Sequence, residues 1–323
     1  MRLGKLRFES KYLAIQYYYR QKSWSIRWMC RKLGITRAAY YKWIHREIPA
    51  EELENQTLAQ LIQEYDQRFG HILGRKRMCS WINALNHKHY NVKRVHRLMK
   101  ELNIHSVIRR KRKKYQRCTP EATAENLLAR DFYAETPNLK WTTDVTEFKW
   151  YQGDKVQKLY LSAILDLYDR SVVSWVIRGR NDNKLVLDTF QKAIQANPDA
   201  KPLFHSDRGF QYTSKVFQAK LKQQGMVQSM SRVGHCIDNG PTEGFWGIVK
   251  SEMYYTGNFT DAASLRKAIS DYIDFYNNER LQERFGDKPP AQIRAEALDL
   301  DNPMQYPIAP NKRIEKYKSR FTA

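Results

Sequence analysis

The period of the hydrophobic pattern changes once along this chain, near residue 137, and this change limits the folds that the chain can adopt. Up to about residue 105, apolar residues recur every three or four positions, as on one face of a helix. After residue 137, β-branched and aromatic residues dominate three runs, residues 140–151, 158–169 and 170–180. We therefore predict small helical modules first and a sheet-containing domain second.

The second part of the chain alternates strands with helices. The three runs predict an antiparallel meander, because turn-forming residues separate them. The pattern then predicts a helix at 184–196, a strand at 202–207, a helix at 214–224, a strand at 226–231 and a helix that contains Glu243. This order, βββαβαβα, indicates an α/β domain, which we assign to residues 137–300.

Positive charge is concentrated in the helical part. Residues 1–117 contain 28 Lys and Arg against 8 acidic residues, so they carry +20 of the chain's net charge of +22. A strongly basic region of this size is the expected binding surface for a polyanion, and nucleic acid is the first partner to consider.

Residues 1–48 predict a helix-turn-helix module. Gly34 ends one short helix, and Thr36 is placed to cap the next. On the second helix, Arg37, Tyr41 and Lys42 are expected to point outward toward a DNA groove. An ordinary helical hairpin with a solvated basic face fits the same pattern.

Residues 49–108 predict a second helix-turn-helix module with three helical stripes. Asn91 is placed to cap the third helix, on which Lys93, Arg94 and Arg97 fall opposite the apolar side. We expect these three side chains to face DNA.

Residues 109–136 predict a linker that is first basic and then polar. Its basic run is expected to lie along DNA phosphates or to remain solvated. The run consists of Arg109, Arg110, Lys111, Arg112, Lys113 and Lys114. Residues 301–323 predict a basic tail.

Cysteine spacing and hydropathy exclude some classes of protein. The four cysteines are scattered and form no C-x-x-C pair, which argues against a disulfide framework or a zinc ribbon. No apolar run approaches the length of a membrane span, so we expect a cytoplasmic protein without a membrane partner.

Three acidic residues have a spacing that suggests shared chemistry. Asp144 and Asp207 fall on predicted strands, and Glu243 follows Asp207 after 35 intervening residues. Lys250 lies seven residues after Glu243, on the same helix face. On position alone Asp238 and Glu252 compete with Glu243. Glu147 and Asp166 are further acids on the strands.

These acids lie in four segments that resemble a known family. The segments are WTTDVTEF, FHSDRGFQY, DNGPTEGFW with Lys250, and YNNER at 276–280. They resemble the D,D-35-E transposases and retroviral integrases, and specifically the second-reading-frame transposase of the insertion sequence 3 family. The resemblance implies a ribonuclease H-like core with a mixed five-stranded sheet.

The resemblance also implies residue roles. Asp144, Asp207 and Glu243 would be both catalytic residues and metal ligands, and Lys250 would contact DNA phosphate. Oxygen-only ligation suits Mg²⁺ or Mn²⁺, and two ions about 4 Å apart would serve phosphodiester chemistry. His205, Ser206 and Asn239 would orient ligands or DNA, or have only packing and capping roles.

The implied function is DNA transposition. Such a transposase binds double-stranded DNA at the terminal inverted repeats of an insertion sequence, nicks 3′ ends and joins them to target DNA. The resemblance further implies a bacterial, nucleoid-associated homo-oligomer, acting with or without fusion to the product of an upstream reading frame. The alternatives are a structure-specific or RNA-hybrid nuclease of the same fold and a non-catalytic DNA-binding regulator.

Overall fold

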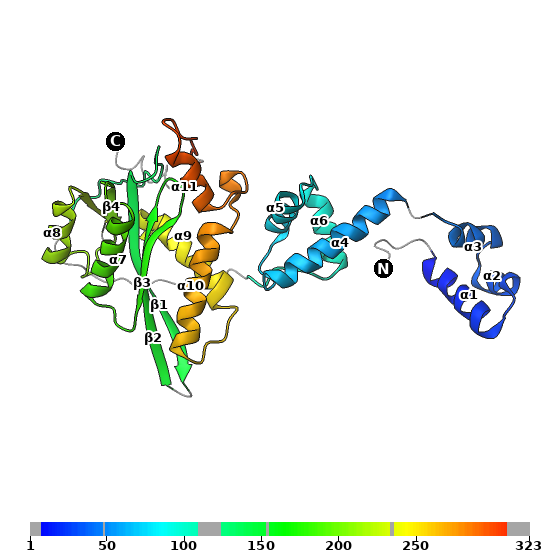
Figure 1. Ribbon diagram of the computed structural model, residues 1–323. Helices are drawn as coiled ribbons and strands as arrows, with labels where there is room; N and C mark the ends of the chain where they lie inside the picture. Colours follow the sequence, from blue (N-terminus) through cyan, green and yellow to red (C-terminus); the bar gives the residue numbers. More distant parts are fainter. Residues whose placement is uncertain (1–7, 48, 109–123, 153–154, 233–235, 309–323) are drawn as a thin grey trace, which may run out of the picture. The chain divides into compact units, whose positions relative to one another are not determined.

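The computed structural model describes residues 8–47, 49–108, 124–152, 155–232 and 236–308 (Figure 1). The chain divides into two compact units, Met1–Ser106 and Val107–Ala323, and each is described by itself. None of the described helices is long and apolar enough to cross a membrane.

The first three helices of unit 1 are α1 (Glu9–Lys22), α2 (Ile26–Leu33) and α3 (Arg37–Ile44). Gly34 follows α2 with φ 66°, a left-handed conformation that glycine adopts without strain. Thr36 caps α3, because its Oγ1 accepts a hydrogen bond of 3.2 Å from the backbone N–H of Ala39. The predicted pair of helices is confirmed, and α1 adds Tyr12 and Ile15 to their core.

The other helices of unit 1 are α4 (Ala50–Arg68), α5 (Arg75–Asn86) and α6 (Val92–Glu101). Asn91 caps α6, as predicted, through an Oδ1 contact of 2.8 Å with the backbone N–H of Lys93. The turn after α4 contains His71 with φ 62°, and a 2.6 Å contact between His71 Nδ1 and Asp66 Oδ2 holds it.

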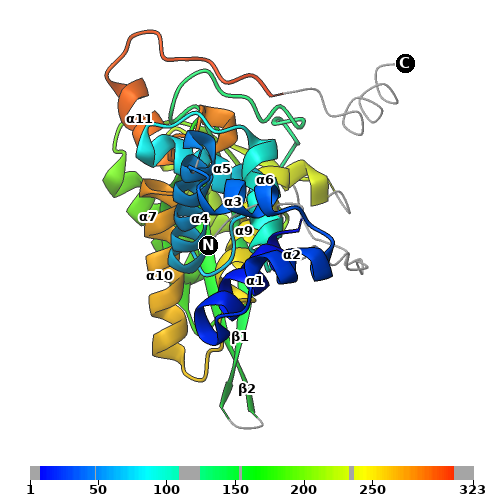
Figure 2. The same cartoon turned by 90° about the vertical axis from the view of Figure 1, so that its right-hand side faces the viewer.

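Unit 2 contains a mixed five-stranded sheet in the order β3-β2-β1-β4-β5, which confirms the predicted fold class. Strands β1 (Lys140–Gln152), β2 (Lys155–Asp166) and β3 (Val172–Arg178) are antiparallel. Strands β4 (Leu203–Ser206) and β5 (Val227–Met230) continue the sheet in parallel with β1. The long β1–β2 hairpin extends beyond the other strands (Figure 2).

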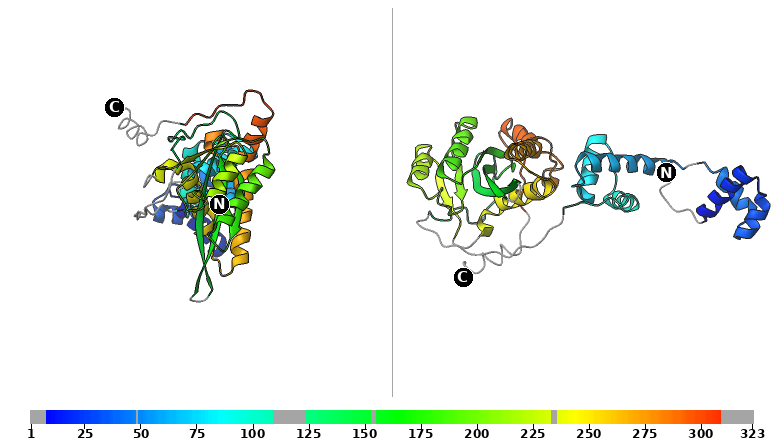
Figure 3. Two further views of the ribbon diagram at one scale, coloured as in Figure 1. Left: turned by 90° about the vertical axis from the view of Figure 1, so that its left-hand side faces the viewer. Right: turned by 90° about the horizontal axis from the view of Figure 1, so that it is seen from below.

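Helices cover both faces of this sheet (Figures 1 and 3). One face carries α7 (Asn183–Ala196) and α8 (Lys215–Gln223), around a core that includes Trp141 and Phe204. The other carries α9 (Gly240–Val249) and α10 (Ala262–Asn278). A short 3₁₀ turn, η1 (Cys236–Asn239), precedes α9, and η3 (Glu283–Phe285) and α11 (Pro290–Leu298) end the unit.

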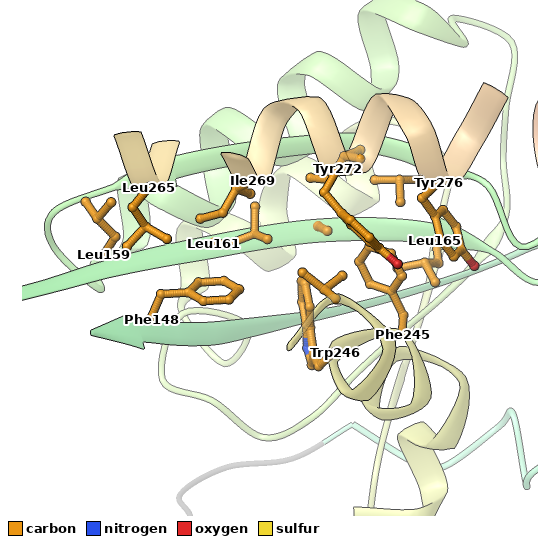
Figure 4. Close-up of a cluster of buried hydrophobic side chains, with 14 residues drawn as sticks. Phe148, Leu159, Leu161, Leu165, Phe245, Trp246, Leu265, Ile269, Tyr272 and Tyr276 are labelled. Carbon is orange, nitrogen blue, oxygen red and sulfur yellow. The ribbon is translucent and has the colours of Figure 1, made fainter. Parts of the chain in front are cut away.

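Helix α9 depends on tertiary packing for its stability, because it contains two glycines. Gly244 and Gly247 have low helix propensity, and both lie on an open side of the helix. Phe245 and Trp246 are buried against β1, β2 and α10 (Figure 4). A π-helical turn, η2 (Lys250–Tyr254), follows α9 directly.

Candidate active site

Three different elements bring Asp144, Asp207 and Glu243 to one edge of the sheet. The parallel pairing of β1 with β4 ends at Thr143 opposite Ser206. Asp144 is therefore the next residue of β1, and Asp207 directly follows β4. Neighbouring strands lie about 4.8 Å apart in a sheet. Glu243 lies in the first turn of α9, which packs on β1.

Burial raises the pKa of all three carboxyl groups, and neighbouring carboxylates add to the rise at Asp144 and Glu243. Burial, followed by the charge of Asp207, raises the pKa of Asp144 to about 7, and the charge of Glu243 adds to this. Burial and then Asp207 raise the pKa of Glu243 to about 7, although the residue as a whole is exposed. Burial also raises the pKa of Asp207. Three acids in this state repel one another when ionised, and a cation between them would relieve the repulsion.

Protein donors orient two of these carboxylates. The indole N–H of Trp246 donates to Asp144 Oδ2 at 3.0 Å, and the backbone N–H of Gly209 donates to Asp207 Oδ1 at 2.8 Å. A Cβ at position 209 would lie 3.0 Å from that same Oδ1, so a larger residue would displace the carboxylate. In the described part of the chain, no group of three His, Cys, Asp or Glu is arranged to hold a metal ion.

Asn239 and Thr242 attach the start of α9 to β1. Asn239 Nδ2 donates to the carbonyl oxygen of Thr143 at 3.0 Å, beside Asp144. Thr242 Oγ1 contacts Thr142 Oγ1 at 2.9 Å and Asn239 Oδ1 at 3.0 Å. All of these residues are buried. Asn239 therefore fixes where Glu243 stands relative to Asp144.

Asp238, one rival for the third position, is fully buried and forms an ion-pair cluster with arginines instead. Its carboxylate accepts hydrogen bonds from Arg130 Nε at 2.6 Å, Arg232 Nε at 2.8 Å and Asn126 Nδ2 at 3.0 Å. Burial alone would raise the pKa of Asp238, but Arg232 and Arg130 lower it to about 2. No local pattern predicts Arg130 as a partner, because it lies 108 residues from Asp238.

Glu252, the other rival, is bound to α10 and the residues after it. Arg280 donates to both of its carboxylate oxygens, at 3.0 and 2.9 Å, and the Tyr272 hydroxyl donates at 2.7 Å. Glu252 lies within the π-helical turn η2, so these bonds fix the turn that follows the Glu243 helix.

The two remaining strand acids also have cationic partners. Glu147 pairs with Lys158 at 2.9 Å, which lowers the pKa of Glu147. Asp166 is fully buried and pairs with Arg294 of α11 at 3.0 Å. Both acids are therefore committed to structural ion pairs.

His205 and Ser206 are the last two residues of β4, and the His205 side chain contacts Ser229 of the neighbouring strand β5. His205 is fully buried between Ser229 Oγ at 2.9 Å and Ser231 Oγ at 3.1 Å, and burial lowers its pKa to about 4. Ser206 Oγ donates to the carbonyl oxygen of Asp207 at 2.9 Å. These contacts connect the two residues to the sheet and to the backbone at Asp207.

Lys250 is the first residue of the π-helical turn. Its Nζ lies 5.6 Å from the centre of the Phe148 ring, on the side of β1 that faces α9. The α-helix continues unbroken from Gly240 to Val249, so the two-turn spacing from Glu243 is preserved.

The predicted DNA-contacting residues differ in their surroundings. Arg37, Tyr41, Lys42, Lys93 and Arg97 are exposed on α3 and α6. Arg94 instead reaches α4, where its Nε donates to Asn55 Oδ1 at 2.8 Å. The run from Arg109 to Lys114 lies outside the described residues.

Known proteins resemble this chain in both units. Residues 134–236 and 243–298 match integrase core domain families, and residues 52–112 match an HTH-like domain family. InsK of insertion sequence element IS150 from Escherichia coli K12 is 39% identical over 64% of this chain and 72% of its own length. Transposase InsF for insertion sequence IS3A, from the same organism, is 30% identical over 89% of this chain and 99% of its own.

A solved structure is also similar to part of this chain. It is the HTLV-2 integrase catalytic core domain in complex with magnesium, with 23% identity and a TM-score of 0.40. The similarity covers 49% of this chain and 97% of that one.

Proposed function

The chain belongs to the insertion sequence 3 family of DNA transposases, which cut and join DNA, and from this premise we propose that Asp144, Asp207 and Glu243 carry the reaction. The observation that supports this most is the placement of the three acids at one sheet edge, where burial and then the charge of Asp207 raise the pKa values of Asp144 and Glu243. The other acids considered for the site, Asp238 and Glu252, are paired with arginines.

The three acids are not arranged as a closed ligand cluster in the described part of the chain, but their donor chemistry fits a divalent cation. All three supply carboxylate oxygens, the ligands that Mg²⁺ and Mn²⁺ prefer, and the cation would offset their repulsion. We propose that these residues hold one or two such ions. When bound, the ions would stabilise negative charge on the attacking and leaving oxygens of a phosphodiester.

The chain's own groups orient the site. Trp246 and Gly209 hold one oxygen each of Asp144 and Asp207, so these carboxylates do not rotate away from the sheet edge. Asn239 holds the start of the Glu243 helix against β1. We propose that Lys250, two turns from Glu243, binds a phosphate of the DNA end.

The proposed reaction has two stages at one site. Water first hydrolyses a phosphodiester at the end of the element and leaves a 3′-hydroxyl. This hydroxyl then attacks a phosphodiester of the target, so that a new P–O bond joins the two strands and the target strand's own 3′-oxygen leaves. Terminal inverted repeats and target DNA are the proposed partners, bound by Arg37, Tyr41, Lys42, Lys93, Arg97 and the basic run 109–114. We also propose that the protein acts as a homo-oligomer on DNA, alone or with an upstream reading-frame product.

Substitution of the acids tests this proposal. Asp144→Asn, Asp207→Asn and Glu243→Gln should each abolish nicking and joining of a terminal-repeat duplex, with DNA affinity changed less than about threefold. Glu147→Gln is the matched control, because it removes another β1 acid that pairs with Lys158. Active Glu243→Gln protein would show that another residue completes the site.

Metal binding has its own test. Mg²⁺ or Mn²⁺ should raise the unfolding temperature of the wild-type protein, and the rise should disappear in Asp207→Asn. An unchanged rise in that variant would place the ion elsewhere. The alternatives, a nuclease of the same fold or a non-catalytic regulator, are not favoured by the transposase relatives.

A further inference from the structure

An exposed row of four aromatic rings follows the junction of α1 and α2. Tyr17 meets Tyr18 edge-on with ring centres 5.2 Å apart, Tyr18 stacks on Trp24 at 4.9 Å, and Trp24 meets Trp28 edge-on at 5.7 Å. We call these four residues the aromatic row. Their exposed fractions are 60%, 40%, 45% and 42% in chain order.

The aromatic row is not part of the hydrophobic core of α1, α2 and α3. The core below it uses other residues of the same helices, namely Tyr12, Ile15, Met29 and Cys30. Ser23 ends α1 in a left-handed conformation, with φ 51°, and the chain then turns so that Trp24 lies over Tyr18. Four large exposed rings in one contiguous group are more typical of a binding surface than of a solvated one.

The charge around the aromatic row identifies the kind of partner. No acidic residue occurs between Glu9 and Glu47, whereas nine Lys and Arg lie in that stretch. Five of the nine are exposed on the helices that carry the rings, namely Arg20, Lys22, Arg27, Arg31 and Lys32. A second copy of this surface would be repelled, and a polyanion would be attracted.

We propose that the aromatic row binds unpaired bases of a DNA strand, with the flanking cations on its phosphates. Paired bases inside a duplex already stack on their neighbours, so exposed rings gain more stacking energy with a strand whose bases are unpaired. Every base has a ring face, so this binding is tolerant of sequence. The proposal rests on the proposed function only in taking DNA as the polymer, because it requires neither the acids nor end recognition.

The test uses the full chain and two labelled probes at one salt concentration: single-stranded oligothymidylate and a duplex of the same length. Fluorescence anisotropy should show that Trp24→Ala combined with Trp28→Ala weakens single-strand binding about 10- to 100-fold, the range expected for one lost stacked base. Duplex binding should change less than about twofold. The pair Trp24→Phe with Trp28→Phe should restore most single-strand affinity, because the rings remain.

Tyr19→Ala is the matched control. Tyr19 is an equally exposed tyrosine of α1, at 52%, and it is not part of the aromatic row, so its loss should leave both affinities unchanged. Equal losses on duplex and single strand, or no loss on either, would overturn the proposal. Tighter binding of a matched RNA strand than of DNA would reassign the surface to RNA. Loss of self-association in sedimentation, with DNA binding intact, would instead identify an interface between copies.

Discussion

Replacing Asp238 with asparagine tests whether it is a structural acid, unlike the proposed catalytic residue Glu243, which lies only five residues away. Asp238 and Arg130 are 0% and 2% exposed, with Oδ1 and Nε 2.6 Å apart. Asparagine would place a neutral amide against Arg130 and Arg232 where a carboxylate now accepts from both. We expect a large loss of stability rather than a selective loss of chemistry.

The size of this loss follows from the buried pair. Removing one partner of a buried ion pair costs about 3–5 kcal/mol. The pKa of Asp238 is lowered from 3.8 to about 2. This shift means that the fold stabilises the charged form of Asp238 over its protonated form by about 2 kcal/mol, which is a smaller value than the cost of removing the partner. For a unit of this size, 3–5 kcal/mol lowers the unfolding temperature by about 6–20 °C. Because the folded pKa is depressed, this contribution is complete above about pH 4 and is lost as pH falls toward 2.

The assay is thermal unfolding of the full chain at pH 7, without added metal, together with strand transfer at a temperature where the variant remains folded. Asp238→Asn should unfold early and retain transfer activity while folded. Glu243→Gln should keep or raise the unfolding temperature and have no activity. A stable but inactive Asp238→Asn protein would refute the structural role and return Asp238 to the candidate ligands.

Four further outcomes are expected. Lys250→Arg should retain strand transfer and Lys250→Glu should lose it, because only the charge reversal repels phosphate; equal rates would remove Lys250 from the DNA path. Without metal, the raised pKa values of Asp144 and Glu243 contribute stability below about pH 4, and this stability is lost as pH rises through about 7. The unfolding temperature of the wild-type protein should therefore fall between pH 5 and 8, and Asp144→Asn should make this fall smaller. Parallel curves of unfolding temperature against pH would contradict this. His205→Gln should lower the unfolding temperature with little change in transfer rate per folded molecule, whereas a slower rate in folded protein would indicate a role in the reaction. A chain that begins at Val107 should bind DNA with a shallower salt dependence and less selectivity for terminal repeats than the full chain, and an unchanged slope on salt titration would place end recognition in unit 2.

Local patterns predicted the five strands of unit 2 and its helices α7, α8 and α9 because strand and helix periods repeat within a few residues. The runs around Phe148, Leu161 and Val172 became β1, β2 and β3, and Ser214 caps α8 close to the predicted start. The sequence did not predict α1, since Tyr17, Tyr18 and Tyr19 follow one another and leave no clear apolar stripe. The π-helical turn after Val249 was not predicted either.

The site was harder to predict because its selection depends on distant charges. Spacing alone left Glu243, Asp238 and Glu252 in competition, and no local pattern separates them. The cations that bind the two rivals come from elsewhere: Arg130 lies 108 residues before Asp238, and Arg280 lies 28 residues after Glu252. The resemblance identifies Glu243 as the third acid. The structure gives a physical reason against Asp238 and Glu252, because arginines already bind both carboxylates.

The order of the parts along the chain also sets an order in time. The helices α1 to α6 end by Glu101, whereas the sheet edge that gathers the three acids needs Glu243 and the helices up to Leu298. At about 5–20 residues per second, a ribosome requires roughly 10–40 s to synthesise the part of the chain between those points. During that interval the basic helices of a nascent chain can already form, while Asp144 still lacks Asp207 and Glu243. On the roles proposed above, a growing chain can bind DNA before the site that would cut DNA is complete.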